Sequence, residues 1–273
     1  MCERPKIAVL RFPGMNCEEE TRRAVIAAGA SCDIFMWNGP KDVLETYDGY
    51  VLPGGFSYQD RVRAGGIAAK DHVVDCLFEQ AENGKPVIGI CNGAQILIEA
   101  GMVPGIEFGR VQMGLARNIM PGRDGYYTRW THLVPAHRAS CATAELTPGS
   151  TVPVPTAHAE GRFVTTQDGL IEELFANGQV VFTYGAPDGS PSRGFPDNPN
   201  GSARDIAGMS NPEGNVVAMM PHPERSSWMF HVPTGLPGEW GRRRREAAGG
   251  DLGAPGPGAG VLASLVSFVK RRG

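Results

Sequence analysis

The sequence has no long hydrophobic run and only a small excess of charge. Its 273 residues contain no stretch of about 18 apolar residues, so we expect no membrane-spanning segment. The apolar part of the N-terminal MCERPKIAVLRF is too short for the hydrophobic region of a signal peptide, and we expect no targeting segment. The net charge is −3 with both signs interleaved, which argues against a nucleic-acid surface because phosphate binding requires concentrated basic residues.

Paired cysteine motifs are also missing. The six cysteines are scattered and include no C-x-x-C pair, which argues against a disulfide framework and against a zinc site. We therefore expect reduced thiols, a cytoplasmic protein and no bound metal. The cysteines are Cys2, Cys17, Cys32, Cys76, Cys91 and Cys141.

Short apolar runs alternate with helix-length segments through the first hundred residues, which predicts βαβ units and a parallel sheet. At 16–29, Asn16 and Glu19 form a pattern typical of a capping box at the start of a helix. The expected strands are 6–12, 32–37, 47–52 and 86–90, and the expected helices are 16–29, 67–83 and 92–100.

The pattern changes after residue 101, where proline, glycine and threonine increase and long helices are absent, so antiparallel strands are expected up to about 162. Apolar runs return at 179–184, 206–209 and 216–220, and a closing helix is expected after a Gly/Pro-rich linker. We predict an α/β fold: one domain over 1–273 with a flavodoxin-like open, mostly parallel sheet flanked by helices, added antiparallel strands, and an extended tail at about 228–273. The tail carries Arg242, Arg243, Arg244 and Arg245, a run that usually forms a solvated face.

The string GICNG at 89–93 lies between an apolar strand and an apolar-periodic helix. It has the form of the nucleophile elbow, G-x-nucleophile-x-G, with Cys91 in place of serine. The start of a helix favours a thiolate because the helix dipole is positive there. We therefore interpret Cys91 as a nucleophile, although a buried structural cysteine is the general alternative.

Two His-x-Glu pairs compete for the role of base. His158 and Glu160 lie in the irregular middle region, whereas His222 and Glu224 directly follow an apolar strand in PHPER. The ends of strands are where an open α/β sheet assembles its site, which favours the second pair. A turn histidine and a surface ion pair with Arg225 are the alternatives for that pair.

An oxyanion site is expected at the end of the strand at 47–52, in the sequence LPGGF. Backbone N–H groups of Gly55 or Phe56, together with that of Asn92, would stabilise the negative charge of a tetrahedral intermediate. An ordinary turn at Pro53 and its two glycines is the alternative.

The segments PGGFSYQD (53–60), GICNGAQILIEAG (89–101) and MPHPER (220–225) together resemble a class I glutamine amidotransferase. More narrowly, the chain is similar to the glutaminase component of phosphoribosylformylglycinamidine synthase. FPGMNCEEET (12–21), PTAHAEGRF (155–163) and the segment at 198–225 support the narrower match, which covers roughly residues 5–230.

The resemblance implies a triad of Cys91 as nucleophile, His222 as base and acid, and Glu224 as the group that orients the imidazole. It implies that Gln95 contacts the substrate L-glutamine, and that the ammonia passes to a large synthase subunit, often accompanied by a small third subunit. No phosphate-cradling Walker loop is present, so this chain needs no cofactor of its own, and ATP and Mg would be used by the partner.

Several alternatives stay open on the sequence. The acceptor could belong to another pathway, since only the family-specific segments argue for purine synthesis, and a non-catalytic assembly subunit is a further reading. For the four arginines, a contact to the synthase is the sharper hypothesis. Cys17 is expected to be structural because no base motif accompanies it, and His158 and Glu160 receive no role.

Overall fold

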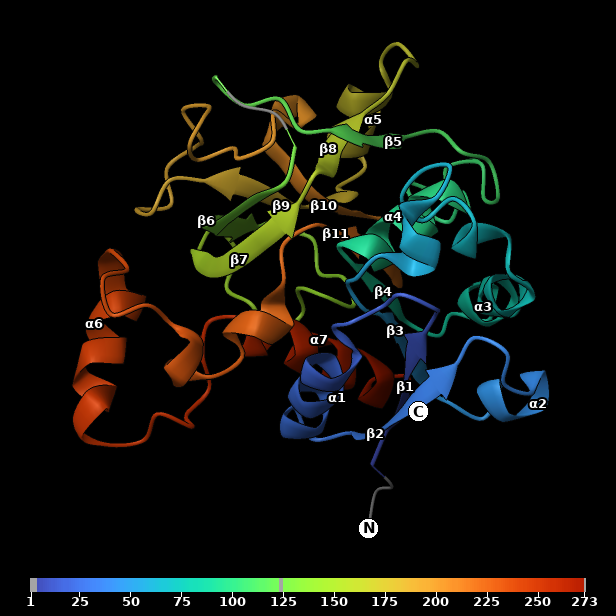
Figure 1. Cartoon of the computed structure of the whole chain (residues 1–273), viewed down its shortest axis with the longest axis horizontal. Helices are drawn as coiled ribbons and strands as arrows, with labels where there is room; N and C mark the ends of the chain where they lie inside the picture. The colour runs from blue at the N-terminus through green and yellow to red at the C-terminus, as the bar shows by residue number, and fades with distance from the viewer. Residues whose placement is uncertain (1–3, 123–124, 273) are drawn as a thin grey trace.

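A nine-stranded mixed sheet forms the centre of the computed structural model, which describes residues 4–122 and 125–272 (Figure 1). Cys2 lies outside the described residues. In sheet order the strands are β2 (Ser31–Met36), β1 (Lys6–Arg11), β3 (Gly49–Leu52), β4 (Val87–Ile90), β11 (Val216–Met219), β10 (Ile206–Ser210), β9 (Val180–Gly185), β6 (Tyr127–Pro135) and β7 (Val152–His158).

The first five strands in this order are parallel, and the remaining pairings are antiparallel. The parallel part has the order 2-1-3-4-5 that characterises flavodoxin-like sheets. Its central strands β3, β4 and β11 are buried along their whole length, because helices cover both faces of the sheet. The predicted α/β class, with antiparallel strands added to a parallel sheet, is confirmed. A second sheet pairs β5 (Gly114–Arg117) with β8 (Glu160–Val164).

The helices lie on both sides of the parallel strands (Figure 1). Helices α1 and α7 pack against each other on one side, while α3 and α4 lie on the other. The helices are α1 (Glu18–Ala27), α2 (Lys41–Leu44), α3 (His72–Glu82), α4 (Asn92–Glu99), α5 (Leu170–Ala176), α6 (Gly238–Glu246) and α7 (Ala259–Lys270).

Two expected helices differ from the observed ones. Helix α1 begins after Cys17, which is its N-cap residue and makes no side-chain cap hydrogen bond, so the predicted capping box at Asn16 is wrong. Glu19 pairs instead with the following arginines Arg22 and Arg23. The helix expected at 67–83 is broken at Asp71, whose extended ψ of 140° separates the 3-10 helix η2 (Ala68–Lys70) from α3.

The C-terminal segment folds back onto the domain. Met229, Val232 and Leu236 form a small apolar cluster of their own, against which Trp130 of β6 packs. The arginine run lies in α6, where Arg242 pairs with Glu246 on the same helix. The expected closing helix is α7, and it buries Val261, Leu262, Leu265 and Val266.

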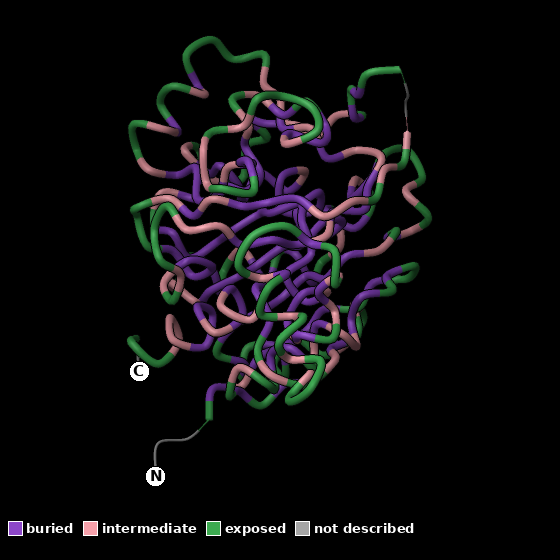
Figure 2. Tube along the Cα trace, turned by 90° about the vertical axis from the view of Figure 1, so that its left-hand side faces the viewer, coloured by how far each residue is buried: buried purple, intermediate pink, exposed green. Residues whose placement is uncertain are grey.

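Burial is concentrated in the interior strands, and the loops at the periphery are exposed (Figure 2). Among the described residues, every helix is too short or too polar to cross a membrane.

Candidate active site

Cys91 occupies a strained turn between β4 and α4. Its φ of +51° and ψ of −105° are unfavourable for a residue with a Cβ atom, at a cost of about 1–3 kcal/mol. The backbone N–H of Cys91 donates to the carbonyl of Met219 on the neighbouring strand at 2.8 Å. A Cβ atom on Gly93 would overlap the carbonyl of Leu52, so this turn can pass close to β3 only with glycine there. The local geometry is that of a nucleophile elbow.

His222 lies at the same edge of the sheet as Cys91. Strands β4 and β11 are parallel neighbours with Ile90 opposite Met219, so residues just beyond their carboxyl ends come together. His222 Nδ1 and Glu224 Oε1 are 2.5 Å apart, and both side chains are almost completely buried. The carboxylate therefore fixes the orientation of the imidazole, with Nε2 on the other side of the ring. No hydrogen-bond partner for Nε2 is present among the described residues.

The electrostatic environment favours a charged imidazole. Burial lowers the pKa of His222, but the negative charges of Glu224 and of a Cys91 thiolate raise it, and the net result is a pKa well above the usual value. The nearby sulfur atoms of Cys17 and Cys91 raise the pKa in the same direction. An imidazolium next to a thiolate is the ionic form that a cysteine nucleophile requires.

The turn that follows β3 runs beside this pair. The N–H of Phe56 donates to the carbonyl of Gly14 at 3.0 Å, so it is not available to an oxyanion in this conformation. Gly55 is bridged to Met15 and has a φ of +148°, which favours glycine. Asn92 is the first residue of α4, where a backbone N–H has no partner within the helix. Two N–H groups were expected to donate from this turn. Because that of Phe56 is bonded to the Gly14 carbonyl, that of Gly55 is the candidate oxyanion donor.

A cavity of about 80 Å³ opens beside Cys91. Gln95 lines it, with its amide held by the Glu160 carbonyl at 2.7 Å and its oxygen held by the Asn92 side chain at 2.9 Å. Asp60 also lines the cavity, and burial together with the charge of Glu160 raises its pKa to about 6. The wall of the cavity thus includes two acidic residues, Asp60 and Glu160, together with Cys91.

The second His-x-Glu pair does not form a couple of the same kind. His158 is buried beside the cavity, and its Nδ1 lies 3.1 Å from the side-chain oxygen of Asn118. Burial and the neighbouring His222 lower the pKa of His158 to about 3, so it is neutral. No hydrogen bond joins His158 to the Glu160 carboxylate in the part of the chain that the structure describes. The pair at 222 and 224 is the one with the geometry of a base and its orienting group.

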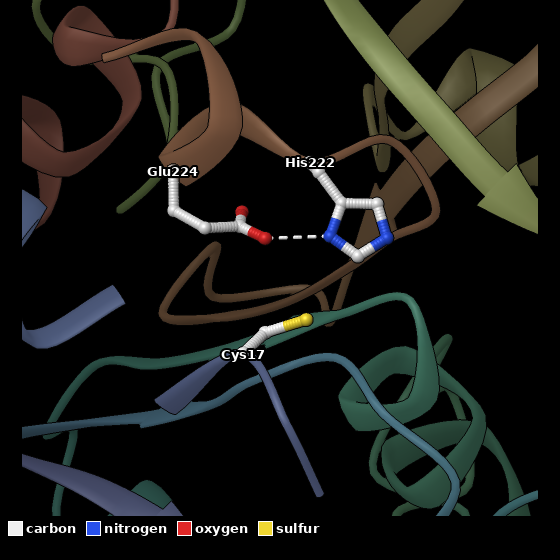
Figure 3. A group of neighbouring side chains, drawn as sticks. All are labelled: Cys17, His222 and Glu224. Atoms are coloured by element: carbon white, nitrogen blue, oxygen red, sulfur yellow. Dashed lines mark hydrogen bonds and ion pairs between the residues drawn. The ribbon is translucent and has the colours of Figure 1, made fainter. Parts of the chain in front are cut away.

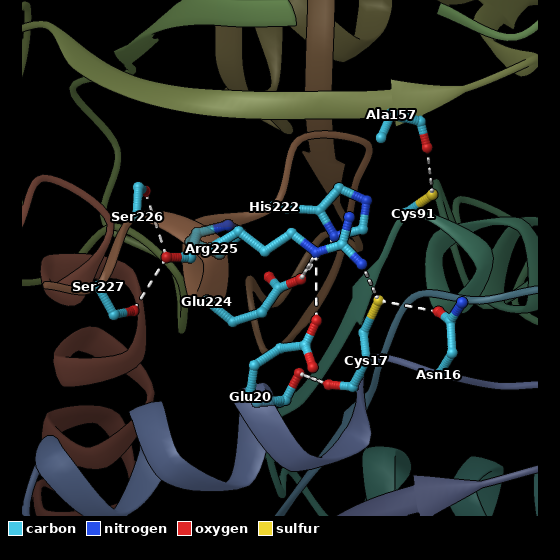
Figure 4. A network of polar contacts seen from close by, with 12 residues as sticks. Asn16, Cys17, Glu20, Cys91, Ala157, His222, Glu224, Arg225, Ser226 and Ser227 are labelled. Atoms are coloured by element: carbon cyan, nitrogen blue, oxygen red, sulfur yellow. Dashed lines mark hydrogen bonds and ion pairs between the residues drawn. The ribbon is translucent and has the colours of Figure 1, made fainter. Parts of the chain in front are cut away.

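Two contacts of Cys17, one with the His222–Glu224 couple and one with Arg225, were not foreseen from the sequence. The thiol of Cys17 and the carboxylate of Glu224 lie within 4.8 Å of each other and of His222 (Figure 3). Arg225 donates from Nη2 to the Cys17 sulfur at 2.9 Å and from Nε to Glu20 at 3.2 Å (Figure 4). The sequence offered one signal for these contacts. Cys17 follows β1, and the carboxyl end of β1 lies at the same edge of the sheet as the carboxyl ends of β4 and β11.

The chain matches the family of the CobB/CobQ-like glutamine amidotransferase domain over residues 4–247, and it belongs to this family. A curated relative from Methanothrix thermoacetophila, the phosphoribosylformylglycinamidine synthase subunit PurQ, is 46% identical over 98% of this chain and 99% of its own length. The Pyrococcus furiosus subunit of the same name is 40% identical over 82% of this chain and 91% of its own. These relatives confirm the predicted resemblance.

Solved structures agree. The structure of PurLQS from Thermotoga maritima superimposes with a TM-score of 0.70 and 28% identity, covering 97% of this chain and 99% of that one. The glutaminase domain of CTPS from Trypanosoma brucei, with bound acivicin, has a TM-score of 0.52 at 16% identity and supports the fold alone.

Proposed function

We propose that this chain is the glutaminase component of a phosphoribosylformylglycinamidine synthase, and that Cys91, His222 and Glu224 are its catalytic triad. The observation that carries the proposal is the strained Cys91 turn beside a buried imidazole–carboxylate couple, on neighbouring parallel strands. The printed names of the curated relatives support the choice of synthase.

The proposed reaction begins with attack of the Cys91 thiolate on the carboxamide carbon of glutamine. The N–H groups of Gly55 and Asn92 stabilise the oxyanion, and loss of one donor would cost roughly 3 kcal/mol of transition-state stabilisation. His222 donates its Nε2 proton to the leaving nitrogen, and ammonia departs. His222 then accepts a proton from water, which attacks the thioester carbon and releases glutamate together with the Cys91 thiolate.

The lining of the cavity supports an amino-acid substrate. The carboxylates of Asp60 and Glu160 provide negative charge for the α-ammonium group of glutamine, and Gln95 is placed to contact its side chain. Because the pKa of Asp60 is raised to about 6, its carboxylate is charged at neutral pH and becomes protonated, losing that charge, under mildly acidic conditions.

The ammonia is proposed to pass to a large synthase subunit, which uses ATP and Mg to amidate formylglycinamide ribonucleotide. The Thermotoga maritima neighbour is described as PurLQS, and this supports a synthase partner and a small third subunit. The described cysteines are all free thiols, which supports a cytoplasmic location.

The decisive experiment measures glutamate release from glutamine by the full chain, alone and with its copurified synthase partner. We expect release by the wild type and by Cys32→Ser, a buried thiol on β2, and none by Cys91→Ser. A covalent γ-glutamyl adduct on the wild type, with the mass of glutamine less ammonia and absent from Cys91→Ser, would identify the thioester. Equal release by wild type and Cys91→Ser would refute the proposal.

A further inference from the structure

Cys17 is a buried thiol that the proposed reaction does not use, yet it lies against the base. Its sulfur is the acceptor for Arg225 Nη2 at 2.9 Å, and its S–H donates to the side-chain oxygen of Asn16 at 3.2 Å. The sulfur and a ring nitrogen of His222 lie within 4.8 Å of each other, and the thiol raises the pKa of the imidazole. The thiol is therefore held on two sides by fixed polar groups and presents its third side to the imidazole (Figure 4).

The backbone of Cys17 is attached to the turn that carries the expected oxyanion donor. The N–H groups of Asn16 and Cys17 both donate to the Gly54 carbonyl, at 3.4 Å and 3.2 Å. A Cβ atom on Gly54 would lie 2.6 Å from His222 Cε1 and 3.1 Å from the Cys17 sulfur. Cys17, Gly54 and His222 thus form one close-packed contact, in which a shift of any member moves the other two.

A metal site is the first alternative for this cluster, because Cys17, His222 and Glu224 offer sulfur, nitrogen and oxygen ligands within 4.8 Å. Two observations disfavour it. The sulfur already carries the guanidinium of Arg225, whose positive charge would repel a cation. The 2.5 Å separation of His222 Nδ1 and Glu224 Oε1 is shorter than the roughly 3.3 Å that separates two ligands with bonds of about 2.0 Å in a tetrahedral site.

We propose that Cys17 is a positioning residue for the glutaminase reaction, whose thiol and backbone N–H together hold the His222 imidazole and the Gly54–Gly55 turn in their reactive arrangement. The thiol acts in its neutral form, because burial raises its pKa and the favourable contact with His222 does not overcome that effect. This inference rests on the proposed function and adds a residue to it. Cys17 does not line the cavity beside Cys91.

The proposal predicts a specific kinetic signature. Cys17→Ala removes the sulfur atom that accepts from Arg225 and that packs beside the imidazole of His222. The imidazole should then be misplaced, and kcat should fall by about ten- to a hundred-fold. KM should change little, because Cys17 is not part of the cavity wall. Cys17→Ser retains a donor and an acceptor at the same place and should recover most of the lost kcat.

The pH profile provides a second readout. His222 must stay protonated to release ammonia, and the contact with Cys17 helps to keep it so. We expect the alkaline limb of the kcat profile to move to lower pH in Cys17→Ala and to return toward the wild-type position in Cys17→Ser. The other titratable groups that face or influence the imidazole are Glu224, Cys91, His158 and Tyr126, and none of them is substituted in these variants. The guanidinium of Arg225, 4.0 Å from the Glu224 oxygen that holds the imidazole, is also retained, although it loses its sulfur acceptor in Cys17→Ala.

The experiment compares wild type, Cys17→Ala, Cys17→Ser and Cys32→Ala in glutamate release with the synthase partner, and measures Tm for each. Cys32→Ala is the matched control, since it removes a buried thiol from β2, on the outer edge of the sheet. Cys91→Ser in the same assay tests the glutaminase function itself, so failure of that function and failure of the positioning role give different results. A Cys17→Ala variant with kcat within twofold of wild type, or with its alkaline limb unmoved, overturns the inference. Equal losses in Cys17→Ala and Cys17→Ser overturn it as well.

Discussion

Gly54→Ala adds one methyl group at the point where the oxyanion turn contacts the base. The backbone of Gly54 is not in the left-handed region, so alanine is tolerated there by the main chain. The new Cβ would stand 2.6 Å from His222 Cε1, whereas carbon atoms in contact prefer about 3.6 Å. The methyl group and the ring must therefore separate by roughly 1 Å.

The direction of this movement determines its effect on catalysis. The imidazole is held to Glu224 on one side, at 2.5 Å, and is enclosed in the interior, so it can only tilt or be pushed away from its present place. A displacement of about 1 Å at a reacting group costs on the order of a hundred-fold in rate. This factor corresponds to about 2.7 kcal/mol in the activation barrier.

The assay is glutamate release at saturating glutamine in the presence of the synthase partner, with Tm measured in parallel. Gly235→Ala is the control, because a Cβ at that position meets nothing within 4 Å. We expect Gly54→Ala to lose kcat by about a hundred-fold. Overpacking should also cost about 1–3 kcal/mol of stability, so Tm falls below that of Gly235→Ala while the protein still folds. If kcat falls less than threefold while the fold is intact, the close contact between the turn and the base has no part in catalysis.

Three further predictions follow from single contacts. Glu224→Gln removes the charge that offsets the effect of burial on the pKa of His222. The alkaline limb of the kcat profile should therefore move to lower pH, and kcat should fall by about 10²- to 10⁴-fold. An unmoved limb in the pH–rate profile would contradict the role assigned to Glu224. Asp60→Asn should raise KM and, in initial-rate measurements, abolish the fall of kcat/KM below a pH of about 6. An unchanged acid limb of the kcat/KM profile would exclude Asp60 from binding the ammonium group of the substrate. Gly93→Ala should lower Tm strongly because its methyl group overlaps the Leu52 carbonyl. The free energy of unfolding measured in a denaturant titration should fall by about 1–3 kcal/mol or more. A wild-type Tm would show that the turn at Cys91 can relax.

Much of the fold was predictable because it depends on local patterns. Buried strands of four to six residues with helices between them indicate a parallel sheet, and GICNG indicates where a strand turns sharply into a helix. The choice of His222 over His158 was favoured by the position of His222 after a strand, and the structure gives that histidine the buried carboxylate partner. These inferences use spacing along the chain and the general geometry of α/β sheets.

The contacts that could not be predicted are those between distant segments. Asn16 resembles a helix cap in sequence, but the N–H groups of Asn16 and Cys17 donate to the Gly54 carbonyl, and α1 begins only after Cys17. The Phe56 N–H was expected to be available, yet the same approach of the two loops gives it the carbonyl of Gly14 as a partner. In each case a tertiary backbone hydrogen bond between the residues after β1 and those after β3 overrides the local pattern.

The order of the strands explains why these segments meet. Strands β1, β3, β4 and β11 are consecutive neighbours and run in the same direction, so the residues after their carboxyl ends form a row along one edge. Cys17, Gly54, Cys91 and His222 follow these four strands, and the loops after β1 and β3 bring Cys17 and Gly54 close to His222, although the four are separated by up to about two hundred residues in sequence. Because each is attached to a buried strand, their mutual positions are determined by the packing of the sheet and need no substrate to assemble them. A substitution that disturbs one place in the row should therefore be detected at its neighbours, and the effects of Cys17→Ala and Gly54→Ala should be less than additive in the double variant, since both act on the same imidazole.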